Sequence, residues 1–165
     1  MKLFLYHHQL GGSALLEAIN KKLQQLCSKL NHRSLNYCAS MRLFYAPGMA
    51  GSTFAEIAQA AVAPYCVLGG HKVANVEEIL QELQTAVVFR EDFGAHANPT
   101  FCDSPECNAL VTEITSMIRS QFIHSESIYW VWFSQGHPFY PVFWDFAFLI
   151  ECPPDAFLFV ASCSD

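Results

Sequence analysis

The 165-residue chain lacks any long uninterrupted apolar run, which excludes an ordinary membrane-spanning helix. Such a helix needs about 18–20 apolar residues, whereas the best candidate, Val142–Ile150, has nine residues and contains Asp145. The N-terminal segment MKLFLYHHQLGG holds only four apolar residues in a row before two histidines, too few for the core of a signal peptide. We therefore expect a protein that neither crosses a membrane nor carries an export signal.

Charged residues are also scarce, and cations are nearly missing from the second part of the chain. Charged residues make up 15% and hydrophobic residues 52% of the sequence, a balance that excludes an intrinsically disordered chain. Residues 1–72 carry seven Lys or Arg and two Glu, which gives +5, and residues 73–165 carry two Arg and thirteen Asp or Glu, which gives −11; the sum is the formal charge of −6. This acidity disfavours direct nucleic-acid binding. It favours a basic protein partner or a solvated acidic surface without further function.

The chain has seven cysteines, an odd number, so they cannot all be paired in disulfides within the chain. Without an export signal, free thiols are expected in place of a disulfide framework. This cysteine usage predicts a cytoplasmic protein. The thiols are those of Cys27, Cys38, Cys66, Cys102, Cys107, Cys152 and Cys163.

No nucleotide-binding motif is complete, and we expect no cofactor. In the segment YAPGMAGSTF, Gly48 and Gly51 precede Ser52 and Thr53 at the expected start of a helix, where backbone N–H groups can hold a phosphate or a carboxylate. The segment has neither the lysine of a P-loop nor the GxGxxG spacing of a dinucleotide-binding fold. The alternative is an ordinary strand-to-helix turn.

The patterns that are present predict four helices. Apolar residues recur at steps of three and four from Ser13 to Leu30, which predicts an amphipathic helix with Ser13 as its N-cap. The segments GSTFAEIAQAAVAP and NVEEILQELQ each begin with a capping-box pattern, and SPEC begins a long helix with proline at its first helical position. The capping residues are Thr53 with Glu56, Asn75 with Glu78, and Ser104 before the helix Pro105–Phe122.

Strand patterns alternate with these helices and then follow them. MRLFYAPG, YCVLGG and TAVVF read as three strands separated by helices, an order that predicts parallel pairing through right-handed crossovers. Ser127–Phe133, Val142–Glu151 and Ala156–Ala161 predict an antiparallel meander with a hairpin at CPPD. We therefore predict one α+β domain over residues 1–165: an N-terminal helix, short βαβ-like units, a long helix, and a C-terminal three-stranded meander in a mixed sheet.

The aromatic block IYWVWFSQGHPFYPVFWDFAFLIE, residues 128–151, contains all three tryptophans. Both alternating faces of its two strands are apolar, which is typical of strands covered on both sides. Two features do not fit a buried core: the connection SQGHPFYP presents aromatic side chains in a turn, and one carboxylate interrupts the second strand. We predict a partner-binding surface formed by His137, Phe139, Tyr140, Asp145, Glu151 and Asp155.

A catalytic alternative uses Cys107, His137 and Asp145. A cysteine in the first turn of a helix gains thiolate character, and a later histidine and carboxylate could complete a nucleophilic set. This order resembles that of the papain-like cell-wall peptidases, although the helix reads Glu106-Cys-Asn108-Ala where that family has Asp-Cys-Ser-Gly. The other interpretation is that Cys107 simply begins the buried stripe of its helix.

A zinc site is a further alternative, but we expect no metal. His96, Cys102 and Cys107, together with His71, are candidate ligands, but the Cys-x4-Cys spacing is loose and no second paired motif exists. Two unrelated thiols on either side of a proline turn explain the spacing equally well. The adjacent His7 and His8 are assigned no function.

The C-terminal segment PVFWDFAFLIECPPDAFLFVASCSD resembles bacterial immunity proteins of polymorphic-toxin and contact-dependent growth inhibition systems. The resemblance implies a small, acidic, cytoplasmic α+β protein that binds and blocks a cognate toxin domain, frequently a basic nuclease, without catalysis. We therefore expect a non-enzymatic protein-binding module, present as a monomer or homodimer. A cysteine-dependent hydrolase and a structural homo-oligomer that buries the aromatic block remain open alternatives.

Overall fold

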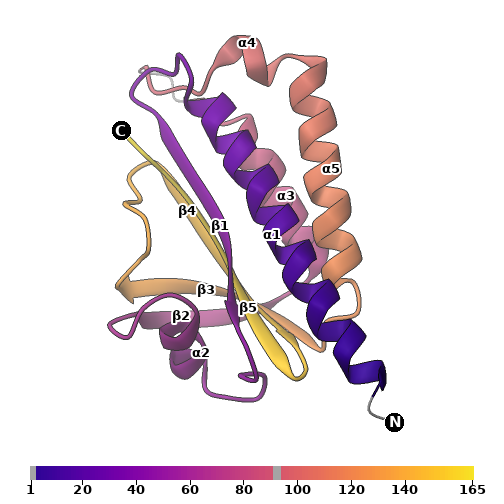
Figure 1. Ribbon diagram of the computed structural model, residues 1–165. Helices are drawn as coiled ribbons and strands as arrows, with labels where there is room; N and C mark the ends of the chain where they lie inside the picture. The colour runs from indigo at the N-terminus through magenta and orange to yellow at the C-terminus, as the bar shows by residue number, and fades with distance from the viewer. Residues whose placement is uncertain (1–2, 91–93) are drawn as a thin grey trace.

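The structure is a computed structural model that describes residues 3–90 and 94–165, and the side chains of the first helix from Ala14 onward (Figure 1). Helices alternate with β1 and β2 in the first half of the chain, and three consecutive strands form its end. The elements in chain order are α1 (Leu3–Asn31), β1 (Cys38–Ala46), α2 (Phe54–Ala61), β2 (Val67–Ala74), α3 (Val76–Val87), α4 (Pro99–Cys102), α5 (Pro105–Phe122), β3 (Ser127–Gln135), β4 (Trp144–Cys152) and β5 (Asp155–Ser164).

Within the described residues, five strands form one sheet in the order β1-β5-β4-β3-β2. Each neighbouring pair is antiparallel. The predicted α+β class is confirmed, and so is the C-terminal meander, in which β4 and β5 are joined by the hairpin at Pro153 and Pro154. Figure 1 shows β2 and β3 running across the direction of β1, so the sheet is strongly twisted.

The predicted parallel pairing and mixed sheet are wrong. β1 and β2 lie at opposite edges of the sheet, because α2 crosses one face between them and brings the chain back against β3. The predicted strand TAVVF is wrong as well, since Thr85–Val87 forms the last turn of α3. The buried stripe of this helix continues through Ala86 and Val87 at helical spacing, and burial on that stripe outweighs the strand propensity of the valines.

The helix starts follow the local sequence signals in three cases of four. Complete capping boxes at Thr53 and Asn75 are confirmed, and the Ser104 side chain accepts the Cys107 N–H at the start of α5. The prediction of Ser13 as an N-cap is wrong, because α1 begins at Leu3. The Gly11–Gly12 pair does not end the helix, since glycine costs a helix only about 1 kcal/mol and removes no hydrogen bond. Among the helices described, none is both long enough and apolar enough to cross a membrane.

Two apolar cores lie on the two faces of the sheet. On β4, Phe146, Phe148 and Ile150 point into the core beneath α1, α3 and α5, whereas Ala147 and Leu149 point into the core beneath α2. Figure 1 shows these two helical layers on opposite sides of the sheet. The expectation that the strand is covered on both sides is therefore confirmed.

Helix α1 covers the outer edge of β1 and bonds to its backbone. The Asn20 side chain accepts the Leu43 N–H and donates to the Leu43 carbonyl, both at 2.8 Å. The Asn31 side chain does the same for Ala39, at 2.7 and 3.0 Å. Two amides therefore bond to the edge of β1 as a neighbouring strand would, which closes this edge to other chains.

We predict that Asn20→Ala lowers the free energy of unfolding by about 2 kcal/mol, because it leaves both Leu43 backbone groups without their partner. Urea denaturation measures this change. Gln24→Ala is the matched control, since Gln24 is an exposed amide on the same helix and forms no hydrogen bond among the described residues. Equal effects of the two substitutions would show that the amide pairing does not stabilise the edge.

Candidate functional site

The loop between β3 and β4, residues 136–143, folds back against the α2 side of the sheet. Gly136 starts the loop at φ +70°, and a Cβ there would lie 2.9 Å from the Cys66 Cα, so only glycine fits. The Cys66 thiol donates to the Gly136 carbonyl at 3.0 Å. The His137 Nδ1 lies 2.9 Å from the Phe139 carbonyl oxygen and 3.1 Å from the Phe139 backbone nitrogen, and the imidazole packs edge-on against Phe133. The start of the loop is therefore held in one conformation.

The aromatic residues of the loop differ in exposure. Phe139 is half-buried and packs against Phe44 of β1, with ring centroids 6.4 Å apart. The Arg42 guanidinium lies 5.1 Å from the Phe44 ring centroid, within the range of a cation–π interaction. Tyr140, in contrast, is 76% exposed. Phe139 thus anchors the loop, and Tyr140 is the side chain that the loop presents to solvent.

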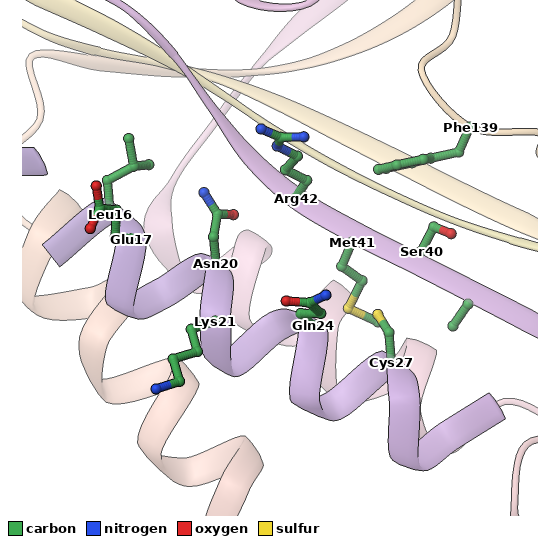
Figure 2. A pocket seen from close by; sticks show the side chains of 11 residues that line it. Leu16, Glu17, Asn20, Lys21, Gln24, Cys27, Ser40, Met41, Arg42 and Phe139 are labelled. Atoms are coloured by element: carbon green, nitrogen blue, oxygen red, sulfur yellow. The ribbon is translucent and has the colours of Figure 1, made fainter. Parts of the chain in front are cut away.

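A groove of about 650 Å³ runs between α1 and β1 and ends at Phe139. Figure 2 shows Asn20 and Gln24 on the side of α1 that faces β1, with Arg42 on β1 itself and Phe139 beyond the strand. The groove carries charges of both signs, from Glu17, Lys21 and Arg42. The remaining lining residues are Leu16, Asn20, Gln24, Cys27, Ala39, Ser40, Met41 and Phe139.

Asp145 lies beside this loop on β4. It shares the α2 side of the strand with Ala147 and Leu149, and its side chain is 45% exposed. Its Oδ2 lies 3.9 Å from His137 Nε2, too far for a direct hydrogen bond, and that nitrogen is buried without a hydrogen-bond partner among the described residues. Burial lowers the pKa of His137, and the Phe139 carbonyl oxygen and Asp145 oppose this only in part. The imidazole is therefore neutral at pH 7, and Asp145 keeps an accessible carboxylate.

Glu151 and Asp155 lie at the other end of β4 and β5. Asp145 and Glu151 are six residues apart on β4, which is about 20 Å at 3.3 Å per residue. The Asp155 carboxylate accepts the Gly48 N–H and the Glu151 carboxylate accepts the Gly51 N–H, both at 2.8 Å. The six predicted contact residues thus fall into two groups, and only His137, Phe139, Tyr140 and Asp145 lie together.

The hydrogen bonds from Gly48 and Gly51 to Asp155 and Glu151 show that the segment YAPGMAGSTF is not an open anion site. The N–H groups of Gly48 and Gly51 are taken by carboxylates of the chain itself, and both glycines adopt positive φ angles. Ser52 and Thr53 complete the turn, with Thr53 in the capping box of α2. The segment is therefore a strand-to-helix turn held by Glu151 and Asp155.

The structure does not bring Cys107 together with His137 and Asp145. Cys107 is 1% exposed in the core beneath α1, α3 and α5, whereas His137 and Asp145 lie on the α2 side, so the sheet separates the thiol from the imidazole. Burial, together with the smaller effects of neighbouring Cys102, Asp103 and Glu106, raises the pKa of the Cys107 thiol to about 11. A thiol in this environment is a packing residue and a poor nucleophile.

The proposed zinc ligands are also dispersed. His71 packs against Phe54 and Tyr129 on the α2 side of the sheet, far from the core that contains Cys107. His96 Nδ1 lies 2.8 Å from the Ala97 carbonyl, and the Cys102 thiol donates to the Val87 carbonyl. Within the described residues, no group of three or more His, Cys, Asp or Glu side chains is placed to hold a metal ion. The side chains of His7 and His8 lie outside the described part of the chain.

Sequence patterns did not point to the groove residues around Phe139. Arg42 and Phe44 belong to this site only because β1 pairs with β5 and the β3–β4 loop folds over them. Asn20 and Asn31 carried a usable signal, since they are eleven residues apart and hence on one side of a helix beside its apolar stripe.

Comparison with known proteins gives no relative from which a function could be carried over. No family model, curated protein or solved structure matches the chain. The site is therefore interpreted from its own residues and geometry.

We predict that native protein is alkylated rapidly at Cys38, which is exposed, and that Cys107 is not modified until the protein unfolds. With a pKa of about 11, only roughly one Cys107 thiol in a thousand is ionised at pH 8. Mass spectrometry after brief iodoacetamide treatment measures both sites, and Cys38→Ser serves as the control that removes the rapid modification. Equal labelling of Cys107 and Cys38 in native protein would restore the cysteine-hydrolase hypothesis.

We also predict that NMR titration of His137 gives a pKa below the ordinary histidine value of roughly 6.5. In Asp145→Asn the pKa of His137 should be lower still, because the negative charge of Asp145, which opposes the effect of desolvation, is gone. The unfolded chain then binds this proton more readily than the folded protein. The stabilising contribution of His137 is therefore present above about pH 6.5 and decreases as the pH falls below it. A titration midpoint at or above the ordinary value would contradict the buried, neutral imidazole.

Proposed function

We propose that this chain is a non-enzymatic protein-binding module whose contact surface is centred on the β3–β4 loop. The observation that carries the proposal is the exposure of Tyr140 on a loop that His137 and Phe139 hold in place, with the exposed Asp145 beside this loop on β4. A rigid loop loses little conformational entropy on binding, which favours affinity.

The chemistry of this surface suits a protein partner. Tyrosine and arginine are the residue types enriched among the energetically dominant contacts of interfaces, and the surface offers the Tyr140 ring and the Arg42 guanidinium on its Phe44 support. The exposed Asp145 carboxylate adds a group that can pair with a cation of the partner.

We propose further that the partner is a cognate toxin domain, so that the chain acts as an immunity protein in the cytoplasm of a bacterium. This rests on the resemblance of the C-terminal segment and on the charge of −11 carried by residues 73–165. Such a charge attracts a basic nuclease domain by long-range steering and disfavours nucleic acid itself.

The two alternatives have less support from the geometry. A cysteine hydrolase requires Cys107 next to a histidine, but the sheet lies between Cys107 and His137. A homo-oligomer that buries the aromatic block requires an open aromatic face, but Phe146–Ile150 of β4 are already buried within the chain.

We predict that this chain, when co-expressed with the toxin domain encoded beside its gene, restores the growth of cells that the toxin inhibits. Tyr140→Ala should weaken the complex about 10- to 100-fold, the usual range for loss of an interface anchor. Asp145→Asn is expected to weaken it less, and Tyr140→Phe least. Growth assays and calorimetric titration of the purified toxin domain measure these effects.

Ile123→Ala is the control, because Ile123 is 50% exposed at the end of α5, on the opposite side of the sheet. Absence of an adjacent toxin gene, or failure of the wild-type chain to restore growth, would refute the immunity function. Unchanged binding by both Tyr140→Ala and Asp145→Asn would place the interface elsewhere on the molecule.

A further inference from the structure

The imidazole of His137 lies between the β3–β4 loop and β4. Its Nδ1 is 3.1 Å from the Phe139 backbone nitrogen and 2.9 Å from the Phe139 carbonyl oxygen. Its Nε2 is 3.9 Å from Asp145 Oδ2 and is buried, without a hydrogen-bond partner among the described residues. Each ring nitrogen therefore faces one part of the proposed binding surface: Nδ1 faces the loop that presents Tyr140, and Nε2 faces the exposed carboxylate.

The two neighbours of the ring together favour one neutral tautomer. In a neutral imidazole one nitrogen donates and the other accepts. With the proton on Nε2, the bare Nδ1 accepts the Phe139 N–H, and the ring N–H lies on the side of the Asp145 carboxylate. With the proton on Nδ1, the Phe139 N–H would lose its acceptor and the bare Nε2 would face a carboxylate. The hydrogen-bond network therefore assigns the proton to Nε2.

Protonation changes both contacts of the ring at once. An imidazolium carries a hydrogen on each nitrogen and accepts no hydrogen bond. Nδ1 then donates to the Phe139 carbonyl oxygen, and the Phe139 N–H loses its acceptor. At Nε2 the new positive charge attracts Asp145, and closing the gap from 3.9 Å to the about 2.8 Å of a charge-assisted hydrogen bond moves the carboxylate toward the ring. One proton thus alters the loop backbone and the carboxylate together.

Asp145 is the charged group that acts on this imidazole within the part of the chain that the structure describes. The titratable or charged side chains of the elements around the ring are Asp145 on β4, Arg42 on β1, Tyr65 and Cys66 before β2, and Tyr140 in the loop. Burial raises the pKa of the Cys66 thiol, which stays uncharged, and an aromatic ring of β1 holds the Arg42 guanidinium. Where β3 and α2 pack here, they contribute apolar side chains such as Phe133.

We propose that His137 is a proton-operated switch of the binding surface. The neutral ring holds the loop through the Phe139 N–H and leaves the Asp145 carboxylate free for a partner, whereas the protonated ring releases that N–H and engages the carboxylate. The consequence for partner binding rests on the proposed function. The coupling of proton, loop and carboxylate is a property of the chain alone.

A partner that binds the neutral arrangement competes with the proton. Partner and proton change each other's affinity reciprocally, so a partner cation that pairs with Asp145 lowers the pKa of His137 further. Because burial already lowers that pKa, the free chain takes up the proton only below about pH 6.5. Partner affinity is then full above the pKa of the free chain and falls by up to about tenfold per pH unit below it.

NMR titration of the chain alone tests the switch. Ring nitrogen shifts should show the proton on Nε2 at neutral pH, and a coupling across the hydrogen bond from the Phe139 N–H to Nδ1 should be present above the His137 midpoint and lost below it. The Asp145 carboxyl carbon should shift at the same midpoint, in addition to its own titration. A neutral ring protonated on Nδ1, or a Phe139 coupling that is absent at neutral pH or that survives protonation, would overturn the proposal.

Calorimetric titration of the toxin domain encoded beside this gene tests the consequence. Wild-type affinity should fall through the His137 midpoint, and His137→Gln should lose this step and keep only the dependence that comes from Asp145. His124→Gln is the matched control, since His124 is exposed beyond the end of α5, and it should keep the wild-type profile.

The two measurements separate the switch from the proposed function. A wild-type complex with the same pH profile as His137→Gln would overturn the switch and leave the immunity function intact. A chain that binds no toxin domain at any pH would refute the immunity function, while the NMR titration would still decide whether one proton controls the loop and the carboxylate.

Discussion

The structure depends on a hairpin that is apolar on both faces. Phe146–Ile150 of β4 and Ala156–Cys163 of β5 are all buried, and burial of each large side chain contributes about 1.5–3 kcal/mol. Both faces of the sheet must therefore be covered. Helices α1, α3 and α5 cover one face, whereas the short α2 covers only part of the other. The β3–β4 loop packs Phe139 against this second face, beside Phe44.

This arrangement explains why the exposed residues of the candidate site are few and well defined. The loop contributes to the core through Phe139 and His137, so its conformation is determined by packing, by the contacts of the imidazole with the Phe139 backbone and by the Cys66 thiol bonded to the Gly136 carbonyl. Tyr140 and Asp145 are consequently presented in a fixed relation to the groove beside α1. A loop that packs on one side and is exposed on the other can bind a partner without first being ordered.

Much of the fold was predictable because its signals are local. The capping boxes at Thr53 and Asn75 and the Ser104-Pro105 helix start depend on residues within one turn, and the C-terminal meander follows from short connections. Local signals failed where a distant partner decided the outcome. Thr85–Val87 is helical because Ala86 and Val87 complete a buried stripe, and Glu151 and Asp155 accept backbone hydrogen bonds of a turn because the β4–β5 hairpin lies beside Gly48 and Gly51.

By itself the amino-acid sequence determined the α+β class, the two-sided burial of the aromatic strands and the turn that exposes Tyr140, because these depend on periodicity and turn chemistry. Only the tertiary structure decided which strands are edges, that Cys107 and His137 lie on opposite sides of the sheet, and that Asn20 and Asn31 close one edge while β2 stays open. Strand order and side-chain proximity depend on how the helices pack across the sheet, which no short stretch of sequence specifies.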